Sequence, residues 1–76
     1  MKYETRILKV AVMDAKQSIF DDGVTFVEIA DDAAGEFVVL SQNEPTGDPK
    51  RMISIDVVEW PELRKAIDDM VKRCKK

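Results

Sequence analysis

The sequence contains no histidine and only one cysteine, Cys74. Without histidine, the chain lacks the commonest general base and the commonest ligand of transition metals, and neither a Ser/His/Asp nor a Cys/His catalytic arrangement can form within it. A single cysteine cannot form an internal disulfide, so the fold does not depend on oxidation. These absences make an enzyme the least supported class, and we expect no catalytic residue, no metal and no cofactor.

Glycine is also scarce, because the chain has only Gly23, Gly35 and Gly47, each in a different predicted loop. A phosphate-binding loop or a dinucleotide fingerprint needs a cluster of glycines, so neither is present. No apolar run approaches the ~20 residues of a transmembrane helix. The first residues are charged and lack the apolar stretch of a signal peptide. We therefore expect a cytoplasmic protein with no membrane partner.

Acidic residues occur in three adjacent pairs, Asp21-Asp22, Asp31-Asp32 and Asp68-Asp69. The alternating spacing of an EF-hand calcium loop is absent from all three. Two pairs lie in predicted turns, where aspartate hydrogen-bonds nearby backbone groups, and the third lies on the charged side of a predicted helix. We predict structural roles for these pairs rather than a metal site.

Alternating and β-branched segments predict strands, and the 76 residues allow a single domain, residues 1–76. The predicted strands cover residues 3–13, 24–30, 36–41 and 51–55, with turns at 21–23 and 31–35 and a long loop at 42–50. Residues 17–20 fit either a further strand or an extended loop. The predicted fold is α+β: a curved antiparallel sheet of four or five strands followed by one C-terminal helix that covers one face (β-β-β-β-α).

The C-terminal segment predicts an amphipathic helix. Asp56 is a candidate N-cap with Glu59 as its capping-box partner, and regular helix is expected from near Pro61. The apolar side carries Trp60, Leu63, Ile67, Met70, Val71 and Cys74. This side is predicted to lie either in the core, which is the interpretation favoured for Trp60, or in a dimer interface. Cys74 is expected to be a partly buried, unreactive thiol. A small domain without disulfides or metals often gains stability by forming oligomers, which favours a homodimer.

The candidate ligand-binding residues are aromatic and basic residues of the strands. Tyr3, Lys9, Phe26 and Arg51 are predicted to share the sheet face away from the helix, with Lys50 next to Arg51. Stacking aromatics among basic side chains are what single-stranded nucleic acid requires. Glutamates nearby in sequence dilute this patch, and residues 1–50 carry a net charge of −5 against +2 for residues 51–76. A dimer-buried or plain solvent face therefore explains the same residues equally well.

Residues 53–67, with the sequence ISIDVVEWPELRKAI, contain an apolar strand end, a capping residue, and a Trp three residues before a Leu and seven before an Ile. This segment resembles the strand-to-helix junction of the positive cofactor four family of transcriptional coactivators. The resemblance implies a β-β-β-β-α unit, a dimer formed through the helices, and binding of single-stranded DNA on the curved sheets.

Two functions remain after these exclusions. The first is a small dimeric module that binds single-stranded nucleic acid in the manner of such a coactivator. The alternative is a protein–protein interaction module that uses an apolar strand face or a sheet edge, as in β-augmentation. Salt distinguishes them, because nucleic-acid binding weakens steeply as counterions are released, whereas an apolar protein interface does not.

Overall fold

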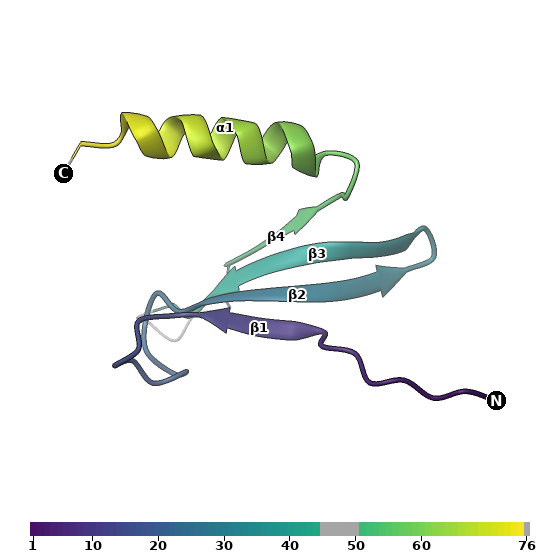
Figure 1. The fold of residues 1–76 in the computed structure, drawn as a ribbon. Coiled ribbons are helices and arrows are strands. Elements are labelled where there is room, and N and C mark those ends of the chain that lie inside the picture. Colours follow the sequence, from purple (N-terminus) through teal and green to yellow (C-terminus); the bar gives the residue numbers. More distant parts are fainter. Residues whose placement is uncertain (45–50, 76) are drawn as a thin grey trace.

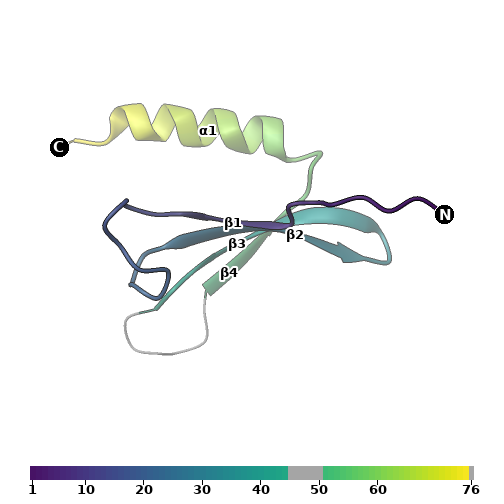
Figure 2. The same ribbon diagram turned by 60° about the horizontal axis from the view of Figure 1, so that its bottom comes forward.

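The computed structural model describes residues 1–44 and 51–75, and these form four antiparallel strands and one helix (Figure 1). In chain order the elements are β1 (Lys9–Val12), β2 (Thr25–Asp32), β3 (Gly35–Gln42), β4 (Arg51–Ile55) and α1 (Trp60–Arg73). Each strand pairs with the next along the chain, so β1 and β4 form the two edges of a single sheet. The curved, twisted sheet is visible from its edge in Figure 2. The predicted α+β class and β-β-β-β-α order are confirmed.

The first strand is shorter than predicted. Residues 1–8 precede β1, although the Leu8 carbonyl still accepts a hydrogen bond of 2.8 Å from Ile29 N. The segment before Leu8 contacts the sheet through the side chain of Arg6. Its Nη1 and Nη2 donate hydrogen bonds to Glu36 Oε2 and Oε1 at 2.9 and 3.2 Å. Residues 17–20 form turns rather than a strand, so the described sheet has four strands and not five.

The hairpin between β2 and β3 is tighter than the predicted five-residue loop. Asp32 pairs with Gly35, which leaves only Ala33 and Ala34 in the connection. Asp32 Oδ1 accepts a 2.8 Å hydrogen bond from Ala34 N, and Gly35 has a φ of 121° that residues with a side chain rarely adopt. The two strands therefore extend to the end of the turn and pair over their full length.

The start of α1 differs from the predicted capping box. The N-cap is Glu59, without a side-chain capping hydrogen bond, and Pro61 lies in the first turn as expected. Asp56 instead closes the turn before the helix: its Oδ1 accepts from Val58 N at 2.8 Å, and its carbonyl accepts from Glu59 N at 3.0 Å. The fixed φ of proline suits the first helical turn, so the helix begins next to Pro61 and not at Asp56. Within residues 1–44 and 51–75, no helix has the length and apolar character needed to cross a membrane.

The core of the single chain is very small. Among the described residues only Val24, Val39 and Ile55 are buried hydrophobics, and no residue of α1 is buried. α1 lies along one face of the sheet but stands away from it over most of its length (Figures 1 and 2). The expectation that the helix would close this face is therefore not met within one chain. The radius of gyration is 15.2 Å, against about 11 Å for a compact chain of this length.

The ion pair between Arg6 and Glu36 should respond to pH, because it forms only while the Glu36 carboxyl is ionised. The hydrogen bond from Arg6, reinforced by its charge, lowers the pKa of the exposed Glu36 carboxyl. The pair therefore stabilises the fold above the ordinary pKa of glutamate, and this contribution is lost as the pH falls through the lowered value. We expect Arg6→Gln to raise the Glu36 pKa toward its ordinary value in an NMR titration of the side-chain carboxyl.

The matched control for this titration is Arg64→Gln, which removes an arginine paired with Asp68 at 3.9 Å on α1. This substitution should leave the Glu36 titration unchanged. An unchanged Glu36 pKa in Arg6→Gln would show that the N-terminal segment does not hold this ion pair in solution.

Candidate functional site

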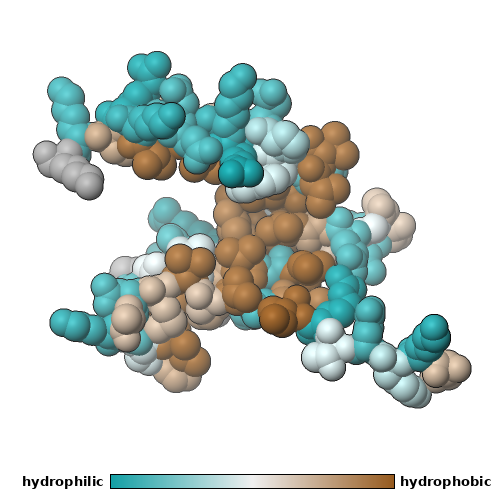
Figure 3. All heavy atoms as spheres, viewed as in Figure 1, coloured by the Kyte–Doolittle hydropathy of each residue, from teal (hydrophilic) through white to brown (hydrophobic). Residues whose placement is uncertain are grey.

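An apolar groove separates α1 from the sheet and is the main candidate binding surface. Its volume is about 370 Å³. The lining residues come from three strands, the turn before the helix and the helix itself: Val27, Val38, Leu40, Ile55, Val57, Trp60 and Ile67. Figure 3 shows the hydrophobic side chains on the underside of α1 and on the sheet below, with an open hollow between them. Val57 was not predicted from the sequence as a groove residue. The only indication there is that an apolar pair, Val57-Val58, follows closely on the last predicted strand.

Strand register makes the groove side of the sheet apolar. In antiparallel strands, residues directly opposite one another project from the same face. Val10 lies opposite Val27, Val27 opposite Leu40, and Leu40 opposite Ile53, so one apolar row crosses all four strands. Val38 and Ile55 form a parallel row next to it. This face, which we call the groove face, continues beyond the groove itself to exposed residues at both edges.

The apolar side of α1 faces the same space. Trp60, Leu63, Ile67, Met70 and Val71 follow one another at helical spacing and form what we call the helix stripe. Leu63 is half-buried, but 43% of Trp60 and 45% of Ile67 is exposed. The prediction that Trp60 belongs to the core is therefore wrong for a single chain. Cys74, predicted to be partly buried, is also exposed.

The opposite face of the sheet brings together two of the predicted ligand-binding residues. Lys9 lies opposite Glu28 in the register, and Phe26 is two residues from Glu28, so all three project from the face away from α1. The Lys9 ammonium lies over the Phe26 ring, 4.9 Å from its centroid, which is the geometry of a cation–π interaction. The exposed Lys9 and the half-buried Phe26 thus form one patch, in which the Glu28 carboxylate lies on the same face.

The structure does not bring the other predicted ligand-binding residues to this patch. Arg51 lies opposite Gln42, which lies opposite Thr25, and this row belongs to the groove face; its predicted position is wrong. Arg51 Nε forms an ion pair of 3.1 Å with Glu44. Tyr3 is 90% exposed and lies in the segment before β1. Lys50 lies outside the described residues.

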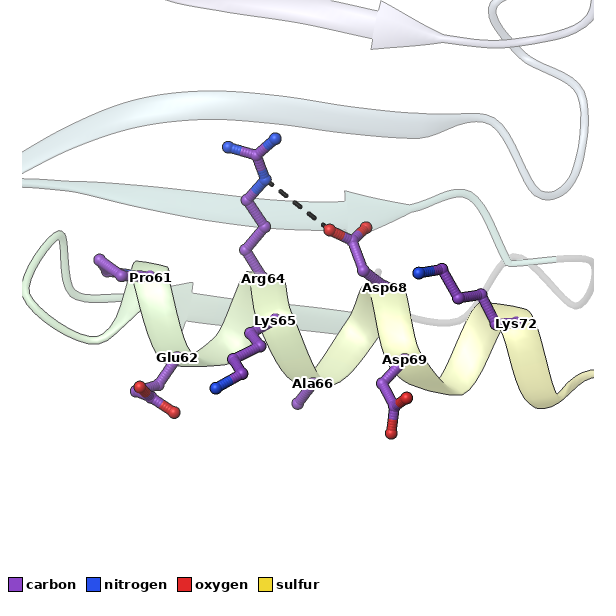
Figure 4. Close-up of a pocket in the computed structure, with 8 residues that line it drawn as sticks. All are labelled: Pro61, Glu62, Arg64, Lys65, Ala66, Asp68, Asp69 and Lys72. Atoms are coloured by element: carbon purple, nitrogen blue, oxygen red, sulfur yellow. Dashed lines mark ion pairs between the residues drawn. The ribbon is translucent and has the colours of Figure 1, made fainter.

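The charged side of α1 carries a shallow, open pocket that has the character of an ordinary solvent face. Its charged side chains carry both signs and project outward in different directions (Figure 4). Arg64 and Asp68 form a long ion pair of 3.9 Å, and Arg73 and Asp69 form another of 3.3 Å on the next turn. Because these charged groups point in different directions and do not converge on one point, this surface offers no recognisable site.

One aspartate of each of the first two acidic pairs closes a turn, and the third pair lies on the exposed side of α1. Asp21 Oδ2 accepts a hydrogen bond from Ser18 N, and Asp32 caps the β2–β3 turn. Asp68 and Asp69 form the ion pairs on α1. No group of three or more residues of the metal-binding types comes together within residues 1–44 and 51–75.

Comparison with known proteins identifies no relative of this chain. No family model matches the chain, and neither a curated protein nor a solved structure is significantly similar to it. The resemblance to the positive cofactor four family therefore rests on residues 53–67 and on the β-β-β-β-α order of the elements.

Proposed function

We propose that this chain is a cytoplasmic, non-enzymatic binding module that works as a homodimer and binds single-stranded nucleic acid on the sheet face that carries Lys9 and Phe26. The observation that supports it best is the pair of facing apolar surfaces, the groove face and the helix stripe, which one chain leaves largely open. A dimer closes these surfaces, and the opposite sheet face then remains available for a ligand.

Surface area supports the dimer. The chain exposes 7041 Å², whereas a compact monomer of its mass exposes about 4,700 Å². The excess of about 2,300 Å² is larger than the roughly 800 Å² that each partner buries in a standard interface. Part of this excess belongs to the extended N-terminal segment. Exposed apolar residues of the groove face and the helix stripe, among them Val10, Ile53, Met70 and Val71, contribute to the rest, and apolar surface of this kind is typical of an obligate interface.

A second copy is the partner that suits the groove best. Every residue that lines the groove is uncharged, so the surface offers nothing for a charged ligand to pair with. Two copies related by a two-fold axis would place the helix stripe of each chain against the groove face of the other. The apolar surfaces then match in chemistry without any further partner, as an isologous interface requires.

The nucleic-acid part of the proposal rests on the Lys9–Phe26 patch. An aromatic ring on an open sheet offers a base a stacking surface, and a nearby ammonium offers the adjoining phosphate a counter-charge. In the free chain Lys9 covers the ring at 4.9 Å. A base that stacks on Phe26 would displace the ammonium toward the phosphate.

The Glu28 carboxylate favours a second candidate function. It lies opposite Lys9 in the register and repels phosphate, while the formal net charge of the chain is −3. A protein partner with a basic surface would be attracted both by the Glu28 carboxylate and by the negative net charge. Such a partner could add a strand to the β1 or β4 edge of the sheet, which are its two outer strands.

The dimer is tested by placing a charge in the helix stripe. We expect the wild-type chain to have the mass of a dimer by light scattering at tens of micromolar, roughly the range in which an interface of standard size holds. Ile67→Glu should reduce that mass to a monomer, because the carboxylate would be buried without a partner. Ala66→Glu, which adds the same group on the charged side of α1, should leave the dimer intact. A monomeric wild type, or a dimer that survives Ile67→Glu, would contradict the proposed interface.

Nucleic-acid binding is tested by anisotropy of a labelled single-stranded oligonucleotide at about 50 and 200 mM salt, the range in which phosphate contacts reveal themselves. We expect saturable binding that weakens steeply with salt. Phe26→Ala should lose about 1–3 kcal/mol of binding free energy, the usual contribution of one stacked base. Phe20→Ala, which removes an aromatic ring from a loop outside the patch, should bind as the wild type does. Absence of binding at low salt would remove the nucleic-acid proposal and leave the protein-interaction candidate.

A further inference from the structure

The loop between β1 and β2, residues 13–24, is built from two consecutive turns that its own side chains close. Gln17 N donates to the Asp14 carbonyl at 3.0 Å, and Asp14 N donates back to Gln17 Oε1 at 2.9 Å. Asp21 N donates to the Ser18 carbonyl at 3.0 Å, and Ser18 N donates back to Asp21 Oδ2 at 2.9 Å. Two reciprocal pairs of this kind restrict the backbone of a connection that contains no strand or helix.

Asn43, which follows β3, attaches this loop to the sheet. Its side-chain amide donates to the carbonyls of Ile19 and Asp21 at 2.9 and 3.0 Å. Its backbone also bonds with the end of the loop, since Gly23 N donates to the Asn43 carbonyl and Asn43 N donates to the Val24 carbonyl, each at 3.4 Å. Gly23 turns the chain into β2 with a φ of 78°. The tip of the loop is therefore restrained both by hydrogen bonds within the loop and by those from Asn43, next to β3.

The residues presented at this tip are apolar. Phe20 is 83% exposed and Ile19 is 52% exposed, whereas the polar groups around them are engaged in the hydrogen bonds that hold the loop. In a typical surface loop the polar side chains face the solvent and the apolar ones are covered, whereas here the apolar side chains are exposed. The loop projects beyond the sheet at the end opposite the β2–β3 hairpin (Figure 1, dark blue). An aromatic side chain on a restrained backbone loses little conformational entropy on binding, which is the property of an interface hot spot.

The surroundings of the tip indicate the chemistry of its partner. The loop carries Asp14, Asp21 and Asp22 against a single base, Lys16, so its rim is acidic. Such a rim repels the phosphates of nucleic acid and attracts lysine and arginine side chains. We propose that Ile19 and Phe20 dock into an apolar pocket of a different protein, and that the pocket is rimmed by basic residues.

A second copy of this chain is a poorer occupant. The apolar groove between the sheet and α1 has no charged residue in its lining, so it offers no basic partner for the acidic rim. In the proposed dimer that groove is already covered by the helix stripe of the second copy. The tip is a separate surface, and its proposed role does not depend on nucleic-acid binding or on the dimer.

The test is a selection of random peptides displayed on phage against the immobilised full chain, with counter-selection on Phe20→Ser. We expect enriched peptides in which aromatic or aliphatic residues are flanked by lysine or arginine. Synthetic copies of these peptides should bind Phe20→Ser about tenfold or more weakly than wild type, as truncation of a hot spot does. Ile19→Ser should weaken the same peptides. Tyr3→Ser, which removes an exposed aromatic ring elsewhere, should bind them as wild type does.

The acidic rim is tested with the same peptides. Asp22→Asn should weaken binding severalfold and reduce its dependence on salt, because one charge pair is lost. The proposal is overturned if no peptide is enriched, if the enriched peptides are acidic, or if they bind Phe20→Ser as tightly as wild type. Competition by a single-stranded oligonucleotide would assign the tip to nucleic acid instead. Loss of the dimer in Phe20→Ser would assign it to self-association.

Discussion

The register of the four antiparallel strands determines which side chains of this protein can meet. It places Val10, Val27, Leu40 and Ile53 in one row and sends Lys9 and Phe26 to the other face. A slip of one residue in any pairing would exchange the faces of that strand and break the row. The groove, the helix stripe that faces it and the Lys9–Phe26 patch all follow from this single alignment, because α1 joins the sheet directly after its last strand.

That alignment gives the chain more apolar surface than one helix can cover. The groove face carries apolar rows beside the polar row of Thr25, Gln42 and Arg51, and the other face retains Val24 and Val39 as buried residues. The thin core is therefore divided between the two sides of the sheet. The turn at residues 56–59 carries α1 away from the sheet, and only part of the helix stripe reaches the groove. Hydrophobic free energy is proportional to the area removed from water, so the open surfaces are the strongest physical reason for a second copy.

Local signals predicted most of the fold, and contacts distant in sequence account for most of the errors. β4 has its predicted bounds, and the tight β2–β3 turn lies within the predicted loop at residues 31–35, because each depends on neighbouring residues. Arg51 is an exception, because strict alternation along β4 already assigns it to the face of Ile53 and Ile55 and its predicted position did not follow that pattern. The apolar spacing of Trp60 and Ile67 identified the helix stripe correctly but not what covers it. Ile19 and Phe20 gave no signal, since an apolar pair in a short segment indicates a strand as readily as an exposed tip.

In the proposed dimer the helix stripe and the groove face are buried against a second copy. Isotope-filtered nuclear Overhauser spectroscopy on a mixture of ¹³C-labelled and unlabelled chains detects only contacts between copies and is therefore the decisive test of this burial. We expect intermolecular signals between the Ile67 methyl groups of one chain and the methyl groups of Leu40 and Ile53 of the other. Intermolecular signals confined to other surfaces, or a chain that shows none, would contradict it.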